Sequence, residues 1–375
     1  MNRLASFGSE LNSIDLYKYV GIFCFALTLS VLMNIIFLKF SKNLGRRNVD
    51  ESIVRWSPVS KPALGGISFY IIFLVTYMLY TLLFHPLLDG LNTKHIGILI
   101  AAGMAFLMGL SDDAYNTNPL LKFLVQVACG CVLILTGTYI SFFELSLFNY
   151  LLTIIWVVAV MNSINMLDNM DGITTIVSLF IICCAMSVAW ISPNFNHFFF
   201  TSLIGVSGAL VGFLFFNWHP SKMFMGDTGS QFLGIFLAIF GIIYFWNNQS
   251  VGVNEEAVSK QFVIVLIAFV IPISDTLTVI INRLRRGQSP FVGGKDHTTH
   301  HLSYLGLSDR NVAQIFAAIA GVSFILIYVI ANVFIIWDIS YSLIFGSWFL
   351  VVFGTLFGIT QLSKTKKRFK EINEK

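Results

Sequence analysis

The stretch FFFTSLIGVSGALVGFLFF-NWHPSKMFMGDT-GSQFLGIFLAIFGIIYFW (residues 198–246) places a short polar connection between two long apolar runs. Each run approaches the length of about 20 residues that a helix needs to cross the hydrocarbon core of a bilayer. The same alternation continues through most of the 375 residues, of which 56% are hydrophobic and 11% charged. A soluble domain carries about 25% charged residues. The pattern therefore predicts an all-α polytopic integral membrane protein.

Eleven transmembrane helices are predicted from the apolar runs. They cover residues 17–38, 66–84, 95–110, 120–138, 147–164, 173–192, 198–216, 229–246, 261–281, 312–333 and 341–361. No internal repeat and no long linker interrupts them, so residues 1–375 are expected to form one transmembrane domain. Residues 363–375 form its basic tail.

Positive charge is unevenly divided between the two sides of these spans. The connections after the odd-numbered spans, together with the tail, hold 19 of the 23 Lys and Arg residues. Because short cytoplasmic loops are enriched in Lys and Arg, we expect an N-terminus outside and a cytoplasmic C-terminus. Attraction to anionic lipid accounts for these juxtamembrane charges, so a nucleic-acid partner is not expected.

Five polar segments carry most of the unusual chemistry, and all five fall on the predicted cytoplasmic face. They read SKPALGG (60–66), LSDDAYN (110–116), NSINMLDNMDG (162–172), FMGDTGS (224–230) and GGKDHTTHHL (293–302). Because charge is costly near lipid, acids and histidines at the mouths of apolar helices indicate a function. A transporter is the main alternative from another class, but its key polar groups would lie near the bilayer midplane. Only Asp275 lies well inside a predicted span.

Adjacent carboxylates, Asp112 and Asp113, end the third predicted span. They repel each other and face the unfavourable end of a helix dipole, so a metal, a cationic partner or a shared proton would relieve them. A solvated helix end explains them equally well. The pair alone therefore leaves both interpretations open.

The third segment places its polar residues at intervals of three, at Asn162, Asn165, Asp168 and Asp171. Helical spacing would put all four on one stripe. Amides and carboxylates together ligate a hard cation or read the edge of a base. A polar seam between helices is the alternative, although two acids in the stripe make it less attractive.

The segment FMGDTGS opens the eighth predicted span. Gly226 and Gly229 permit close backbone approach, and the N–H groups at a helix start favour a phosphate. Asp227 would repel that phosphate unless a divalent cation lay between them, which is how Mg²⁺ usually binds. An Asp N-cap beside glycines is the alternative, but it does not explain the aromatic ring of Phe224.

The last segment holds three histidines within five residues, His297, His300 and His301. Their spacing fits no structural zinc pattern. In a basic loop the imidazoles would clamp phosphate oxygens, with Asp296 holding one ring in a single tautomer. A pH-sensitive surface loop is the alternative. Asp275 is expected either to be functional or to bond within its own helix.

Taken in order, these motifs resemble the polyprenyl-phosphate N-acetylhexosamine-1-phosphate transferases of glycosyltransferase family 4. The resemblance implies transfer of N-acetylhexosamine-1-phosphate from a UDP-sugar to undecaprenyl phosphate, with release of UMP. It also implies Mg²⁺, with Mn²⁺ as a substitute, a homodimer, and a location in the bacterial cytoplasmic membrane with the active site on the cytoplasmic face. Such an enzyme initiates the synthesis of a cell-envelope polysaccharide.

The resemblance further implies roles for individual residues. It assigns catalysis to Asp112, Asp113, Asp168, His300 and His301, substrate binding to Lys61, Asn165, Asp171, Asn217, Phe224, His297 and Asp296, and the metal to Asp227. The expected reaction is an in-line attack by a lipid phosphate oxygen, with Asp112 or Asp113 accepting its proton and the histidines adding positive charge. Double displacement through a phosphorylated Asp112 or Asp113 is the alternative.

Three departures from the family pattern bear on the sugar nucleotide. Asn116 stands where many members carry a third acid, Asn169 replaces a usual Gly, and the histidine loop reads HTTHH instead of HxHH. The form DHTTHHL, followed by LGLS at 305–308, is similar to the N-acetylglucosamine-type enzymes. The translocase that makes lipid I is the alternative within the family.

Overall fold

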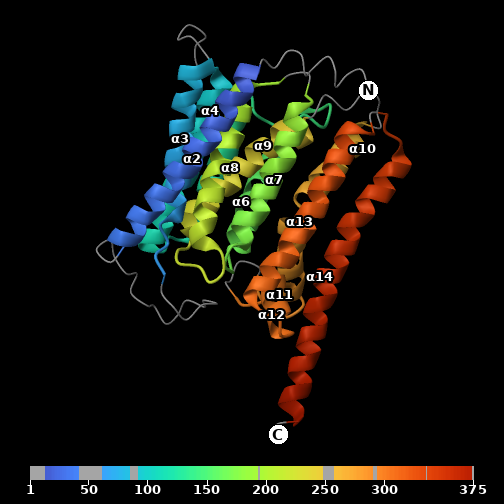
Figure 1. The fold of residues 1–375 in the computed structure, drawn as a ribbon. Helices are drawn as coiled ribbons and strands as arrows, with labels where there is room; N and C mark the ends of the chain where they lie inside the picture. The colour runs from blue at the N-terminus through green and yellow to red at the C-terminus, as the bar shows by residue number, and fades with distance from the viewer. Residues whose placement is uncertain are drawn as a thin grey trace.

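The computed structural model describes residues 13–41, 61–84, 92–192, 195–247, 257–289, 294–334 and 336–373. These residues form a bundle of helices without strands (Figure 1). The helices are α2 (Ser13–Phe40), α3 (Gly65–Phe84), α4 (Thr93–Tyr115), α5 (Pro119–Leu135), α6 (Ser146–Leu167), α7 (Ile173–Trp190), α8 (His197–Asn217), α9 (Gly226–Gly241), the π-helix η1 (Ile242–Trp246), α10 (Ala257–Ala268), α11 (Val270–Leu284), α12 (Thr298–Tyr304), α13 (Asp309–Asn332) and α14 (Ile339–Asn373). Ser60, Gly293 and residues 374–375 of the predicted tail lie outside the described residues, as do six of the Lys and Arg residues counted above: Arg3, Lys42, Arg46, Arg47, Arg55 and Lys375.

Each of the eleven predicted apolar runs contains a helix, which confirms the all-helical membrane class. Within the described ranges, nine helices are long and apolar enough to cross a membrane, or ten with the bent pair α10–α11. The remaining run forms α5, which has 17 residues. The count of eleven crossings therefore stays a prediction.

The ninth predicted span is not one straight helix. The chain bends by 74° between α10 and α11. Pro272 lies in the first turn of α11, where the missing N–H of proline does no harm but continuation of the preceding helix is blocked. The bend directs α11 toward the end of the bundle that also holds α12 (Figure 1).

The helix α9 forms the centre of the bundle. With η1 it makes a span whose most apolar window is 94% buried, in contact with α3, α4 and α6. Two glycines allow this packing, since a Cβ on Gly109 would lie 2.3 Å from the Asp227 carbonyl oxygen and one on Gly66 would lie 2.1 Å from the Gly229 nitrogen. The backbones of α3 and α4 therefore touch the first turn of α9.

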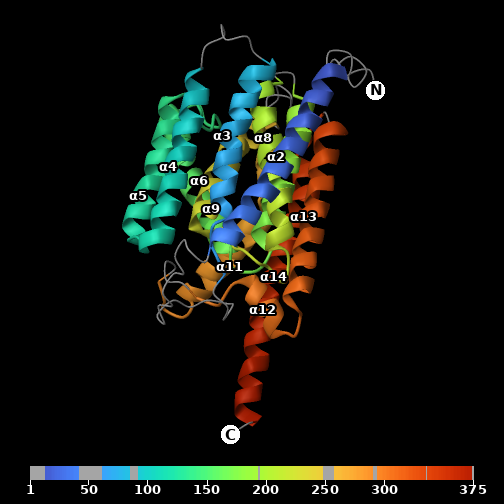
Figure 2. The same cartoon turned by 60° about the vertical axis from the view of Figure 1, so that its left-hand side comes forward.

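The start of α2 and the end of α14 lie at opposite ends of the bundle, as an odd number of crossings requires (Figures 1 and 2). The C-terminal part of α14 extends past the other helices, beside α11 and α12. Which end faces the cytoplasm stays a prediction.

Candidate active site

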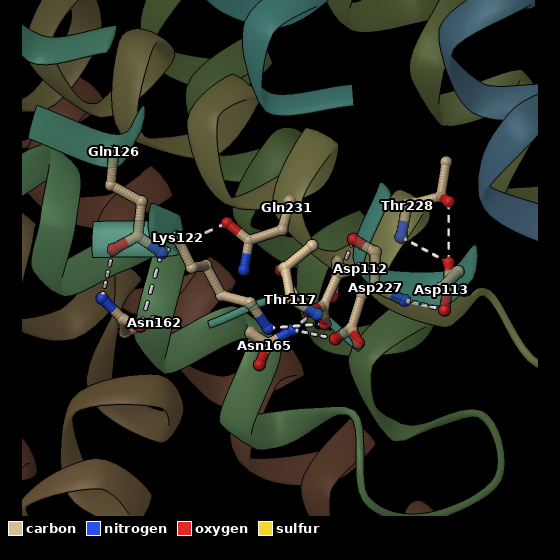
Figure 3. Close-up of polar contacts among 11 residues, drawn as sticks. Asp112, Asp113, Thr117, Lys122, Gln126, Asn162, Asn165, Asp227, Thr228 and Gln231 are labelled. Atoms are coloured by element: carbon tan, nitrogen blue, oxygen red, sulfur yellow. Dashed lines mark hydrogen bonds and ion pairs between the residues drawn. The ribbon is translucent and has the colours of Figure 1, made fainter. Parts of the chain in front are cut away.

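The five polar segments meet around the first turn of α9. Phe224 donates its N–H to the Pro62 carbonyl over 3.0 Å, and Gly66 donates to the Met225 carbonyl over 3.0 Å. Asp113, Asn165 and the residues around them reach α9 from α4 and α6 (Figure 3). The histidine segment joins through Thr299, whose hydroxyl donates to Asn169 over 2.6 Å. The prediction that these segments share one end of the bundle is therefore confirmed.

The carboxylate of Asp113 caps α9 from a different helix. It accepts the N–H groups of Asp227 (3.1 Å) and Thr228 (2.8 Å) and the Thr228 hydroxyl (2.7 Å). Gly226 has a φ of +73°, and a Cβ there would lie 2.5 Å from Asp113 Oδ2, so this turn requires glycine. The expectation that a phosphate binds these helix-start N–H groups is wrong, because Asp113 already uses two of them.

Asp112 points to the other side of the α4 terminus, toward a cation. Its Oδ2 lies 2.7 Å from Lys122 Nζ, and its Oδ1 accepts the hydroxyl of Thr117 over 2.7 Å. Its carboxyl is also hydrogen-bonded to that of Asp227, whose Oδ1 accepts Asn165 Nδ2 over 2.6 Å. We call Asp112, Lys122, Asn165 and Asp227 the acid cluster (Figure 3).

The acid cluster fits a divalent cation of the Mg²⁺ type. Two carboxyls within hydrogen-bonding distance need a proton or a cation between them. Mg²⁺ is usually held by one or two carboxylates together with substrate phosphates, so a cage made only of protein is not required. Among the described residues no group of three or more His, Cys, Asp or Glu side chains converges as a metal site. Asp112 and Asp227 are thus the pair that suits the ion.

The predicted stripe of four polar residues is wrong. Asn162 and Asn165 lie on α6, but the helix ends at Leu167, and Asp168 takes a non-helical φ and ψ of −76° and 57°. The turn that follows needs Gly172, with φ +78°, before α7 begins. The chain therefore leaves the helix between the amides and the acids.

Asp168 nevertheless interacts with the negative charge of Asp227 in the acid cluster. Burial raises the pKa of Asp168 to about 7, and the negative charges of Asp227 and Asp113 add to the rise. At neutral pH its carboxyl is thus divided between the protonated and ionised forms. Such a group can take up or release a proton near the operating pH of a cell.

Asp171 belongs to a second cluster, with Lys61, Ser221 and Phe224. Its Oδ1 accepts the Ser221 hydroxyl over 2.6 Å, and its Oδ2 lies 3.6 Å from Lys61 Nζ. Burial alone would raise the pKa of Asp171, but hydrogen bonds from Ser221 and the Lys61 charge lower it overall. The Lys61 ammonium also lies 5.0 Å from the Phe224 ring centre. This arrangement presents an aromatic face beside an ionised carboxylate.

Asn217 lies beneath this second cluster rather than within it. Its side chain is buried, its Oδ1 accepts the Thr175 hydroxyl over 2.7 Å, and its Nδ2 donates to the Met223 carbonyl over 3.1 Å. Both ends of the amide therefore fix the loop that carries Phe224.

The histidine segment is ordered by Asp275, not by Asp296. His297 Nδ1 lies 2.8 Å from Asp275 Oδ2, and Thr298 donates its N–H to Oδ1 over 2.8 Å. The alternative that Asp275 bonds within its own helix is therefore wrong, as is the ring-holding role expected of Asp296. Asp275 on α11 therefore lies against the start of α12.

Asp296 is held by two arginines. Arg283 Nη2 lies 2.8 Å from its Oδ1, and Arg286 Nη2 lies 2.5 Å from its Oδ2. Burial opposes ionisation, but the hydrogen bonds and charge of the arginines lower the pKa of Asp296 to about 2. This ion pair fastens the loop after α11 to α11 itself.

The remaining two histidines differ in their surroundings. Burial, followed by the charge of His297, lowers the pKa of His300 to about 3. Its ring is therefore neutral at neutral pH in the substrate-free protein, and its part in charge stabilisation stays a prediction. His301 Nδ1 is hydrogen-bonded to the Ser363 hydroxyl on α14. The end of α14 thus supports the histidine segment.

We expect Asp296→Asn to destabilise the protein in a pH-dependent way. The folded-state pKa lies below the unfolded value of about 3.9, so the ion pair stabilises above pH 4 and its effect fades as pH falls toward 2. The loss in unfolding free energy at pH 7 is about 2 kcal/mol. Melting curves at pH 7 and pH 3 measure it, with Asp338→Asn, an exposed acid, as control. Equal melting of variant and wild type at pH 7 would contradict the prediction.

Three residues of this region were not predicted as site residues. Lys122 lies one turn after the helix start at Asn118-Pro119. A single lysine at the end of a span, close in sequence to two aspartates, could have indicated an ion pair. Arg283 and Ser363 gave no such signal, because only the fold brings Arg283 to Asp296 and Ser363 to His301.

Comparison with known proteins agrees with the geometry. Residues 95–245 match the model of glycosyl transferase family 4. A Bacillus subtilis protein named "Probable undecaprenyl-phosphate N-acetylglucosaminyl 1-phosphate transferase" is 32% identical over 58% of this chain and 61% of its own length. The decaprenyl-phosphate N-acetylglucosaminephosphotransferase of Mycolicibacterium smegmatis is 28% identical over 70% of each chain. A phospho-N-acetylmuramoyl-pentapeptide-transferase of Campylobacter jejuni is 25% identical over 73% of this chain and 84% of its own.

The matched region, residues 95–245, contains the acid cluster, the turn before α7 and the whole of α9. The alignment with the Bacillus subtilis relative spans about three fifths of that relative's length. The family match and these relatives agree with the resemblance carried by the motifs. Over residues 95–245 the chain is therefore similar to glycosyl transferase family 4.

Proposed function

We propose that this protein transfers N-acetylglucosamine-1-phosphate from its UDP-activated form to undecaprenyl phosphate, releasing UMP. The observation that carries the proposal is the hydrogen-bonded pair of Asp112 and Asp227 beside Lys122, at the mouth of the most buried helix. Two acids and a cation at the edge of a membrane suit a diphosphate and a lipid phosphate bound together with a divalent ion.

The second cluster supplies a place for the nucleotide. Phe224 offers a ring for stacking on a base, and Asp171 offers an ionised acceptor for the N3–H group of uracil. Lys61 lies between the two and holds both in place. The names of the relatives with higher identity support an N-acetylglucosamine donor over the phospho-N-acetylmuramoyl-pentapeptide donor.

The acid cluster prepares the attack of the lipid phosphate. Asp112 and Asp227 would hold Mg²⁺, with Mn²⁺ as a substitute, and the ion neutralises charge on the phosphates when it is bound. Lys122 attracts the attacking phosphate, and Asn165 fixes the Asp227 carboxylate through Oδ1. Asp168, whose pKa is about 7, accepts a proton from the lipid phosphate, which has a second pKa near 6.

Direct displacement is favoured over a phosphorylated aspartate. A nucleophilic carboxylate needs a free oxygen, yet Asp113 accepts three hydrogen bonds from the α9 turn and Asp112 is engaged by Lys122 and Thr117. Rapid-quench experiments are expected to show product without a glycosyl-phosphoryl enzyme. Trapping such an intermediate on Asp112 would establish the double displacement instead.

One assay tests the proposed function. The purified protein is incubated with undecaprenyl phosphate, Mg²⁺ and a panel of UDP-sugars, and mass spectrometry detects UMP and lipid-diphosphate sugar. We expect product from UDP-N-acetylglucosamine. Absence of product from every sugar would favour the transporter interpretation, and product only from the pentapeptide-bearing donor would identify lipid I synthesis.

A substitution at Phe224 tests the nucleotide site. Phe224→Leu removes the ring but keeps an apolar side chain, so we expect the KM for the UDP-sugar to rise about tenfold. The KM for undecaprenyl phosphate should stay unchanged, and Phe224→Tyr, which keeps the ring, should behave like wild type. Steady-state kinetics with each substrate varied in turn measure this. An equal rise in both KM values for Phe224→Leu would speak against stacking on the base.

A further inference from the structure

Three helices place an amide side chain one turn deeper in the bundle than the acid cluster. The pairs are Asp227 and Gln231 on α9, Lys122 and Gln126 on α5, and Asn165 and Asn162 on α6. We call Gln126, Asn162 and Gln231 the amide tier. Gln126 and Gln231 are almost completely buried, with exposed fractions of 1% and 0%. An amide so deep in a membrane protein requires hydrogen-bond partners.

The side chains of the amide tier are hydrogen-bonded to one another, and Gln126 Nε2 donates back to Asn162 Oδ1 over 3.4 Å. Asn162 Nδ2 donates to the Val158 carbonyl over 2.8 Å and to Gln126 Oε1 over 2.7 Å. Gln126 Nε2 then donates to Gln231 Oε1 over 3.2 Å. Because a backbone carbonyl only accepts, Val158 fixes the orientation of Asn162, and each amide fixes the next. The last atom of the series must therefore be the nitrogen of Gln231.

This nitrogen is a buried donor without an acceptor among the described residues. A buried N–H group left unpaired destabilises the folded protein. Figure 3 draws Gln231 between the Gln126–Asn162 pair and the acid cluster, with its nitrogen turned away from Gln126. Gln126 and Asn162 hold the Gln231 nitrogen in this position. An oxygen atom bound beside the carboxylates would supply the acceptor that this nitrogen needs.

We propose, on the basis of the function proposed above, that Gln231 Nε2 donates a hydrogen bond to an oxygen atom bound in the acid cluster. That oxygen belongs either to a phosphate of the lipid substrate or to a water molecule on the divalent cation. Gln126 and Asn162 are positioning residues, since they keep the nitrogen of Gln231 facing the ligand. A neutral donor suits this position because it stabilises an anionic oxygen without competing for Asp112 and Asp227 as a second lysine would.

Substitution of Gln231 tests the proposal. Gln231→Leu keeps a side chain of similar size and removes the donor, so we expect about a tenfold rise in one of two quantities. A rise in the KM for undecaprenyl phosphate identifies the phosphate oxygen. A rise in the Mn²⁺ concentration at half saturation, measured by electron paramagnetic resonance on the purified protein, identifies the metal-bound water. The KM for the UDP-sugar should not change in either case.

Two further variants sharpen the result. Gln231→Glu places an oxygen where the N–H group stood, so its loss of turnover should exceed that of Gln231→Leu. Gln126→Leu lets the Gln231 amide rotate, so the KM or the Mn²⁺ concentration that Gln231→Leu raises should also rise, but by a smaller factor. Adding Gln126→Leu to Gln231→Leu should cause no further rise. Asn34→Leu is the matched control, because it removes another buried amide, on α2, whose partners are Ser30 and Ser68.

The outcomes separate this proposal from the function on which it rests. If the wild-type protein makes no product from any donor, the proposed function fails, and the Mn²⁺ measurement still tests Gln231. If Gln231→Leu matches the active wild type both in the KM for undecaprenyl phosphate and in Mn²⁺ binding, the donor faces no ligand oxygen and the proposal is wrong. Equal effects of Asn34→Leu and Gln231→Leu on these quantities would overturn it as well.

Discussion

Replacing Asp227 with Asn should reduce turnover by about a thousandfold or more while leaving the fold intact. The substitution keeps the oxygen that accepts Asn165 Nδ2 but removes the charge beside Asp112. Charge stabilisation by a bound metal is worth several kcal/mol in the transition state, and each 1.36 kcal/mol changes a rate tenfold. Turnover of purified protein at saturating Mg²⁺ measures the effect.

Thermal melting of the same variant separates chemistry from folding. Because Asp227→Asn removes one of two adjacent carboxyls, the metal-free variant should melt at or above the temperature of the wild type. Asp309→Asn, on the first turn of α13, is a suitable control for loss of a single acid. Near-wild-type turnover of Asp227→Asn at saturating Mg²⁺ would refute the metal role of Asp227.

Asp113→Ala should damage the fold as well as the activity. The Asp113 carboxylate accepts three hydrogen bonds from Asp227 and Thr228, and its loss leaves buried donors at the start of α9. Each unpaired donor costs about 1–3 kcal/mol, so the unfolding free energy should fall by about 3 kcal/mol or more. Turnover should fall with it, since Asp227 lies in the same turn.

Asp113→Asn is the informative partner of this variant. It retains one acceptor oxygen, so it should recover part of the stability that Asp113→Ala loses. Denaturation of the purified protein, followed by melting temperature, compares the two with wild type. If Asp113→Ala melted like wild type and yet were inactive, Asp113 would act on a substrate rather than as a cap for α9.

Periodicity and charge predicted much of this fold because the membrane imposes a simple rule on helix length. The run 198–216 and the FMGDTGS start of the next span both appear within a few residues of α8 and α9. The bend before α11 was missed, since hydropathy is continuous across it and Pro272 is only a weak local signal. The π-helix at the end of α9 was likewise outside what periodicity resolves.

For the site, residue types were easier to predict than partners. Asp227 was singled out as a metal ligand, and the structure places it beside Asp112 and Asn165. The pairing of His297 with Asp275 was missed because the two residues lie 22 positions apart, one on α11 and the other just before α12. Asp112 and Asp113 are adjacent in sequence, yet they face Lys122 and α9 respectively. Side-chain direction at a helix end depends on neighbouring helices, which one sequence does not reveal.

The burial of α9 also constrains how the protein is assembled in the membrane. The helices that surround it most closely, α3, α4 and α6, all precede it in the chain, and its cap, Asp113, is made earlier as well. Almost the whole surface of this span is covered by other helices, so little of it remains to contact lipid. We therefore expect α9 to pack during biosynthesis against helices that are already made, so that the acid cluster is completed only after α9 is inserted.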